Sequence, residues 1–163
     1  MFRSKFNCNL IFESTDPVDS LYVQVKSSDE KNIELSNFKV EYMRKLLIVV
    51  PCYNEQEVLP QTIEKLSDVL NDLFKKGKIT RDSALVLVND GSRDKTWDII
   101  KEFHTKTDYV YGVNLGANAG HQNALLAGLE YAQDKCDITV TIDADLQDDT
   151  AVIEQMIDKY NDG

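Results

Sequence analysis

The sequence is poor in cysteine and has no long apolar run. Its three cysteines are widely spaced, at Cys8, Cys52 and Cys136. They form neither a disulfide framework nor a Cys-x-x-Cys metal pair, which favours a reducing compartment and hence a cytoplasmic protein. The densest apolar stretch, Leu46–Val50, is far too short to span a bilayer, and no apolar run follows Arg3 and Lys5 as it would in a signal peptide. We therefore expect neither a membrane span nor a leader within these residues.

Basic residues are also scarce. The 163 residues include 18 Lys and Arg against 28 Asp and Glu, which gives a formal net charge of −10. This balance argues against a nucleic-acid partner, because neutralising a phosphate backbone takes clustered cations. It leaves a small nucleotide open as a ligand, since a metal ion and a few backbone amides can hold one anion.

Glycine is absent from the first 41 residues, which differ in pattern from the rest of the chain. Two alternating runs, Leu21–Val25 and Ile33–Val40, flank the polar stretch Ser27–Asn32. This pattern predicts a small β-hairpin or an irregular extension, to which we assign no chemistry. We therefore expect residues 1–41 to form an N-terminal extension and residues 42–163 to form one domain.

From about Lys45 onward, short apolar runs alternate with segments of helical spacing. The runs are Leu46–Val50, Ala84–Val88, Tyr109–Asn114 and Ile138–Ile142. Such runs suit strands that are buried on both faces of a parallel sheet. The first helical segment carries an apolar stripe from Leu59 to Leu73, with Asn54 as its expected N-cap and Gly77 as its expected stop. The alternation predicts an α/β fold with a doubly wound, mostly parallel, Rossmann-like sheet.

Polar and glycine-rich residues follow each predicted strand. The four segments are PCYNE at 51–55, NDGS at 89–92, LGANAGH at 115–121 and DADLQDD at 143–149. Ligands of open parallel sheets bind at the carboxyl ends of the strands, near the point where strand order reverses. Four such segments on one rim therefore predict a binding site.

Asp143 and Asp145 are the candidate metal ligands. If the backbone stays extended past Ile142, residues two apart face the same side. Two carboxylates about 5 Å apart repel by roughly 3 kcal/mol at an effective dielectric of about 20, so either one takes up a proton or a cation lies between them. Oxygen-only ligands indicate Mg²⁺ or Mn²⁺. The alternative is that both residues cap the following helix.

Two further residues on the rim have a chemical and an ordinary interpretation. His121 lies in the first turn of a helix whose N-terminus can hold an anion, so it can contact a donor phosphate; a solvated histidine is the alternative. Cys52 is expected to be a buried apolar side chain rather than a nucleophile, because no histidine lies nearby in the sequence. The sequence contains no Gly-x-Gly-x-x-Gly, P-loop or Gly-x-Ser-x-Gly motif, which excludes three common α/β enzyme classes.

At four places the sequence resembles family 2 glycosyltransferases, which have the GT-A fold. The matching stretches, in the family's order, are LLIVVPCYNEQEVLPQTI, LVLVNDGSRDKTWDII, VNLGANAGHQNALLAGLEYA and VTIDADLQDD. The segment DADLQD is especially similar to the polyprenyl-phosphate branch, the dolichol-phosphate mannosyltransferase-like enzymes. The resemblance implies a truncated GT-A domain, because the family's catalytic domain continues with an acceptor-binding half and several members add membrane helices.

The resemblance also implies roles for the matching residues. Those that would bind the nucleotide are Pro51, Tyr53, Glu55, Asp90 and Asp143. Those that would hold the metal are Asp145, Asp143 and Gln147. There are departures from the family pattern: Asn89 replaces a common aspartate, Thr150 stands where a proline is frequent, and the loop before Gly120 lacks a basic residue. Diphosphate binding would therefore depend more strongly on the metal.

The function implied is transfer of a sugar from a UDP- or GDP-linked donor to a lipid-phosphate or saccharide acceptor, with inversion as the family norm. Such an enzyme would serve cell-envelope polysaccharide synthesis at the cytoplasmic face of a membrane, attached through its missing C-terminal part. A hydroxyl acceptor would need a general base outside this chain, whereas a phosphate acceptor is already anionic. Two alternatives stay open. One is a non-catalytic nucleotide-binding or interaction domain; the other is a nucleotidyltransferase, although the acidic PCYNEQE segment lacks the basic, glycine-rich loop expected there.

Overall fold

The computed structural model describes residues 9–13, 22–26, 43–145, 147 and 149–162. The chain divides into two compact units, Met1–Tyr42 and Met43–Gly163. Each unit is described by itself.

The first unit contains an antiparallel strand pair. It joins β1 (Asn9–Glu13) to β2 (Tyr22–Lys26), with Leu10 opposite Val25. The predicted run Leu21–Val25 falls largely on β2, whose partner is β1. The other predicted run, Ile33–Val40, lies outside the described residues.

The second unit is built on a four-stranded parallel sheet in the order β5-β4-β3-β6. Its strands are β3 (Leu46–Cys52), β4 (Ala84–Asn89), β5 (Val110–Asn114) and β6 (Ile138–Thr141). The chain proceeds from β3 through β4 to β5 and then returns to the other side of β3 for β6. This order confirms the predicted α/β fold, and it places the reversal of strand order between β3 and β6.

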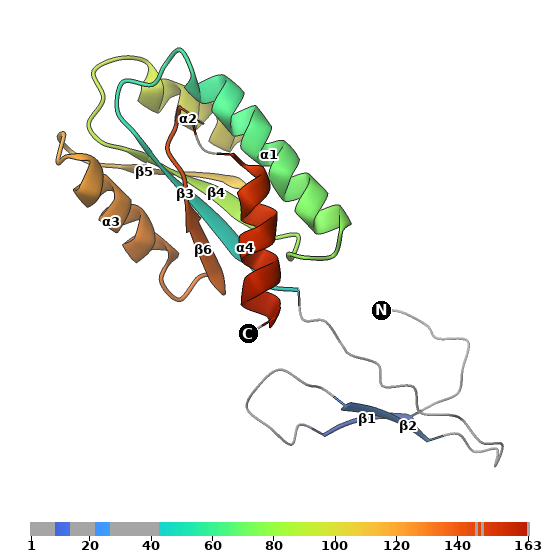
Figure 1. Ribbon diagram of the computed structural model, residues 1–163. Coiled ribbons are helices and arrows are strands. Elements are labelled where there is room, and N and C mark those ends of the chain that lie inside the picture. Colours follow the sequence, from blue (N-terminus) through green and yellow to red (C-terminus); the bar gives the residue numbers. More distant parts are fainter. Residues whose placement is uncertain (1–8, 14–21, 27–42, 146, 148, 163) are drawn as a thin grey trace. The chain divides into compact units, whose positions relative to one another are not determined.

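Four helices cover the sheet (Figure 1). They are α1 (Leu59–Lys75), α2 (Thr96–Lys106), α3 (His121–Ala132) and α4 (Ala151–Asp162). Helix α3 covers one face, and the other three helices cover the opposite face, as expected for a doubly wound sheet. Along β3, Ile48 and Val50 pack in the core on the side of α1 and α4, whereas Leu47 and Val49 pack on the side of α3. None of the helices in the described part of the chain is long and apolar enough to cross a membrane.

Helix α1 begins later than the sequence pattern predicts. The expected cap, Asn54, is not at the helix start, because α1 begins at Leu59 with Pro60 in its first turn. Proline has a φ that suits a first turn and no amide to leave unpaired, so it favours a start here. Asn54 instead adopts a φ of 57° and accepts the backbone amide of Arg93 at 2.9 Å. The predicted stop at Gly77 is confirmed by its φ of 71° just after the helix.

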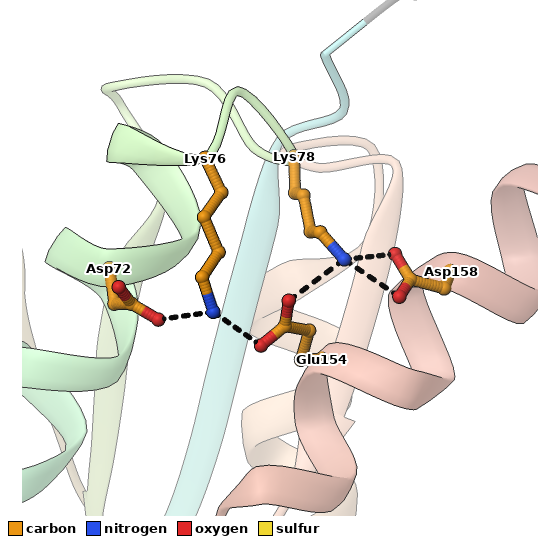
Figure 2. Close-up of polar contacts among 5 residues, drawn as sticks. All are labelled: Asp72, Lys76, Lys78, Glu154 and Asp158. Atoms are coloured by element: carbon orange, nitrogen blue, oxygen red, sulfur yellow. Dashed lines mark hydrogen bonds and ion pairs between the residues drawn. The ribbon is translucent and has the colours of Figure 1, made fainter.

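An ion-pair network connects the end of α1 to α4 (Figure 2). Lys76 contacts Asp72 and Glu154, both at 2.7 Å. Lys78 contacts Glu154 at 2.9 Å and the two carboxylate oxygens of Asp158 at 2.5 and 2.7 Å. Hydrogen bonds from the two lysines hold the pKa of Glu154 below its usual value. The network fixes the helix that follows residues 143–149, and so it restrains the distal end of that segment.

Candidate active site

A pocket of about 240 Å³ lies at the carboxyl ends of β3 and β6, where strand order reverses. Its lining includes residues from all four polar segments of the rim. Every residue predicted to bind the nucleotide is among them, namely Pro51, Tyr53, Glu55, Asp90 and Asp143, together with Asp145. Among the described residues, Gln147 does not line this pocket; its backbone amide donates to Oδ1 of Asp145 at 3.2 Å.

The Asp143-Ala144-Asp145 segment keeps a strand-like alternation although β6 ends at Thr141, one residue earlier than predicted. Ile142 and Ala144 are buried in the core, whereas Asp143 and Asp145 are exposed. Both carboxylate side chains line the same pocket. The alternation therefore presents two acidic side chains to one cavity even though the backbone begins to turn at Ala144.

The helix-capping alternative for these two residues is not what the structure shows. The amide of Ala151, at the start of α4, donates to Oδ1 of Asp149 at 2.9 Å, so Asp149 caps that helix. Asp145 accepts only the nearby amide of Gln147 among the described residues. In the described part of the chain, neither Asp143 nor Asp145 therefore caps α4.

Glu55 adds a third carboxylate to the pocket. Its backbone amide donates to the hydroxyl of Thr96 at 2.8 Å, which fixes the loop after β3 against the start of α2. Burial raises the pKa of Glu55 above its ordinary value, and the negative charges of Asp145, Asp94 and Asp143 raise it further. The pocket is therefore strongly electronegative when it contains no cation.

Removing this charge is expected to stabilise the domain in the absence of metal. Because the pKa of Glu55 is raised above 4.5, the folded state binds more protons than the unfolded chain between pH 4.5 and the folded-state pKa. The free energy of unfolding therefore falls as pH rises through that interval, and the loss persists at higher pH. The Glu55→Gln variant should therefore exceed wild type in free energy of unfolding by about 0.5 kcal/mol at pH 7, the scale of partly exposed charges.

Urea unfolding at pH 7 and near pH 4, with chelator present, measures this difference. The gain should shrink toward zero at the lower pH, where Glu55 is mostly protonated in both states. Glu57→Gln is the matched control, since Glu57 is an exposed residue of the same loop that does not line this pocket. If Glu55→Gln is no more stable than the control at pH 7, burial and the neighbouring carboxylates do not destabilise ionised Glu55.

Asp90 is 2% exposed, and its carboxylate is engaged by the loop before α3. One oxygen accepts the backbone amide of Ala119 at 2.7 Å, and the other accepts that of Gly120 at 3.0 Å. The side chain of Asn118 donates to the carbonyl oxygen of Asp90 at 3.3 Å. Asp90 therefore holds the loop that forms one wall of the pocket. The sequence carries no signal of these contacts, because the partners lie 29 and 30 residues apart.

Gly91 allows the loop before α3 to lie against the residues that follow β4. It has a φ of 60°, and a Cβ built on it would lie 2.4 Å from the backbone nitrogen of Asn118. The neighbouring Asn89, which departs from the family pattern, is buried and donates its side-chain amide to Oδ1 of Asn114 at 2.7 Å. The Asn89 side chain thus joins the ends of β4 and β5 through a hydrogen bond.

Helix α3 begins at the pocket. Gly120 precedes it with a φ of 90°, and no side-chain hydrogen bond caps the helix start in the part of the chain that the structure describes. His121 lines the pocket with Nε2 3.7 Å from Oδ1 of Asp143. Cys52 is buried, as predicted, and burial raises the pKa of its thiol well above the usual range, the environment of an inert cysteine.

The pocket's oxygen donors fit a hard divalent cation that keeps open positions. Among the described residues, no group of three or more His, Cys, Asp or Glu side chains is arranged to hold a metal ion by itself. Mg²⁺ and similar ions are commonly held by one or two carboxylates, with phosphate oxygens and water completing the shell. Two carboxylates beside a cavity open to a ligand are consistent with that arrangement.

Comparisons with known proteins show which family and fold the chain resembles. The profile of the family described as glycosyl transferase family 2 matches residues 47–163. The chain is 46% identical over 118 residues to the uncharacterized glycosyltransferase YkoT of Bacillus subtilis (strain 168), covering 72% of this chain and 35% of YkoT. It is 33% identical over 126 residues to the undecaprenyl-phosphate 4-deoxy-4-formamido-L-arabinose transferase of Enterobacter sp. (strain 638), covering 77% of this chain and 36% of that protein. The chain thus spans about a third of the length of the curated relatives it matches.

Among solved structures, residues 1–349 of S. aureus TarS superpose with a TM-score of 0.52 at 20% sequence identity. The match covers 72% of this chain and 32% of that structure. At this identity the likeness shows the fold alone, and it confirms the GT-A-like fold that the resemblance implies.

Proposed function

The chain belongs to glycosyl transferase family 2, and from this premise we propose that it is the donor-binding half of an enzyme that transfers a sugar from a nucleoside diphosphate to an acceptor. The observation that carries the proposal is the pocket at the reversal of strand order, where carboxylates from two strand ends meet the loop held by Asp90. A site of this kind at the carboxyl edge of an open parallel sheet is the usual place for a nucleotide.

The side of the pocket after β3 takes the nucleobase and the ribose. Pro51 and Tyr53 supply apolar surface there, and Tyr53, a 42% exposed residue, can stack its ring on a planar base. Glu55 and Asp90 supply hydrogen-bond acceptors, because each oxygen of Asp90 keeps a lone pair beyond the one that receives a loop amide. The donor carries uracil or guanine.

The side of the pocket after β6 takes the diphosphate through a divalent cation. Asp143 and Asp145 would hold Mg²⁺ or Mn²⁺. Gln147, the third predicted ligand, does not line the pocket in this structure and would have to turn toward it to add a side-chain oxygen. A bound cation supplies neutralisation of the charge that develops on the departing diphosphate. His121 lines the same pocket beside the N-terminus of α3, and a helix N-terminus favours an anion.

The acceptor is a lipid phosphate. The relative from Enterobacter sp. is named as a transferase acting on undecaprenyl phosphate, and it matches 77% of this chain. A phosphate acceptor is already anionic and needs no general base to remove a proton. The reaction takes place at the cytoplasmic face of a membrane, with inversion at the anomeric carbon, in the assembly of cell-envelope polysaccharide.

Isothermal titration with UDP and GDP, each with Mn²⁺ and with chelator, tests the donor site. We expect one of the two nucleotides to bind in the presence of Mn²⁺. Chelation should weaken binding at least about a hundredfold, because each pair of like charges about 5 Å apart repels by roughly 3 kcal/mol at an effective dielectric of about 20. Equal affinity with and without the cation contradicts the metal site, and no binding of either nucleotide contradicts the donor site.

Activity assays on a full-length protein that contains this chain distinguish an enzyme from a binding domain. Nucleotide binding without sugar transfer to a polyprenyl phosphate or a glycan favours the non-catalytic alternative. Release of pyrophosphate from a nucleoside triphosphate favours a nucleotidyltransferase.

A further inference from the structure

We propose that Thr62 is a positioning residue for the carboxylate pair, and that its hydroxyl fixes the peptide group between Ala144 and Asp145. The hydroxyl donates to the carbonyl oxygen of Ala144 at 2.6 Å, between residues 82 positions apart. Thr62 is 1% exposed and lies in the first two turns of α1. The functional part of this inference rests on the proposed donor site.

The contact to Ala144 is not one that the helix itself requires. Threonine in a helix commonly donates to the carbonyl four residues earlier, and Thr62 lies 3.1 Å from that oxygen, on Val58. A hydroxyl has one proton, so the shorter contact at 2.6 Å is the stronger partner. The donor is therefore directed mainly out of the helix, toward the carboxylate segment.

The hydrogen bond from Thr62 to Ala144 holds the segment just beyond the last hydrogen bond of the sheet. The last ladder contact of the segment is the amide of Ile142, which donates to the carbonyl of Val49 at 3.1 Å. Beyond it, Ala144 is 3% exposed, so its carbonyl group lies where an unpaired acceptor is costly. The oxygen that Thr62 binds belongs to the same planar peptide group as the amide of Asp145. Fixing that plane sets the direction in which Asp145 leaves the backbone.

Thr62 also connects two segments of the rim, the one after β3 and the one after β6, which lie on either side of the strand-order reversal. Helix α1 directly follows the segment 51–55, while Ala144 belongs to the segment after β6. A single buried hydroxyl thus ties the side of the pocket proposed for the base to the side proposed for the metal. Replacing groups that hydrogen-bond and orient metal ligands typically costs about ten- to a hundredfold in metal affinity or activity.

The test compares Thr62→Val with Thr62→Ser. Valine keeps the shape of threonine but has no proton to donate, whereas serine keeps the hydroxyl. In the 163-residue chain, we expect Thr62→Val to weaken Mn²⁺-dependent binding of the nucleoside diphosphate by roughly ten- to a hundredfold, the range seen for such supporting groups. It should also lower the ¹⁵N order parameter of the Asp145 amide without ligand. Thr62→Ser should stay close to wild type in both.

Ser67→Ala is the matched control. Ser67 is also a buried hydroxyl of α1, and it donates at 2.6 Å to Ile63 of its own helix. Its loss costs the helix a comparable contact without reaching the carboxylate segment. We expect unchanged nucleotide affinity and an unchanged order parameter at Asp145 in this variant.

The two measurements separate this inference from the proposed function. An Asp145 amide as ordered in Thr62→Val as in wild type overturns the inference, whatever the affinities are. If Thr62→Val mobilises Asp145 but wild type binds no nucleotide, the positioning contact stands and the donor site is wrong. If wild type and Thr62→Val bind the nucleotide equally despite a mobile Asp145, the hydroxyl does not serve the site.

Discussion

Replacing Asp145 by asparagine is expected to abolish metal-dependent nucleotide binding while leaving the fold intact. The substitution keeps the size of the side chain and the oxygen that accepts the amide of Gln147. It removes the negative charge that the proposed site uses to hold the cation. Because Asp145 is exposed, the free energy of unfolding should change by less than about 0.5 kcal/mol.

Titration with UDP or GDP in Mn²⁺ should show a loss of about a hundredfold or more, equivalent to roughly 3 kcal/mol of lost charge pairing. The control is Asp68→Asn, because Asp68 is an exposed carboxylate on α1 that does not line the pocket, and this variant changes the net charge equally. If Asp145→Asn binds the nucleotide as wild type does, another group holds the cation or none is used.

The strands and their rim could be predicted because both follow from local pattern and one topological rule. The central strands β3 and β4 are buried on both faces, so the runs Leu46–Val50 and Ala84–Val88 are apolar without alternation. The same expectation is wrong for the edge strands β5 and β6, which are partly exposed. Once parallel pairing is assumed, the residues after each run must share one edge of the sheet. The structure brings Glu55, Asp90 and Asp145 into one pocket on that edge.

The contacts that hold the rim could not be predicted, because each joins segments far apart in the chain. Thr62 occupies an ordinary buried position in the helical pattern, and nothing near it indicates a bond to Ala144. Asn54 has the residue type and spacing of a helix cap, yet it adopts a left-handed φ and binds the loop of Arg93. In both cases the tertiary partner decides the role of the side chain, and sequence pattern describes only its local neighbours.

Among single substitutions of polar residues in the pocket, Asp90→Asn is expected to cause the largest loss in free energy of unfolding. Asparagine offers one carbonyl oxygen where the carboxylate offers two, so the amide of Ala119 or of Gly120 loses its acceptor. A hydrogen bond to a charged acceptor contributes roughly 1.5–3 kcal/mol. Because Ala119 is exposed and Gly120 is half-buried, urea unfolding should show a loss near the lower end of that range. A free energy of unfolding equal to that of wild type contradicts the role of Asp90 in holding the loop.

Nucleotide binding by the same variant separates loop holding from base recognition. If the remaining lone pairs of Asp90 accept hydrogen bonds from the base, Asp90→Asn should weaken binding of the preferred nucleoside diphosphate more than binding of pyrophosphate, both with Mn²⁺. Gly91→Ala displaces the same loop without touching the carboxylate, because its Cβ would meet the backbone of Asn118 at 2.4 Å. It should weaken the nucleotide and pyrophosphate by the same factor.

The pair of variants gives a result that neither gives alone. Gly91→Ala combines a strained left-handed φ with a backbone clash, so its loss of stability should equal or exceed that of Asp90→Asn. Any base-selective loss that appears in Asp90→Asn and not in Gly91→Ala must then come from the carboxylate itself, since both variants disturb the loop. Equal losses for the nucleotide and pyrophosphate in both variants mean that Asp90 shapes the pocket and that other groups read the base.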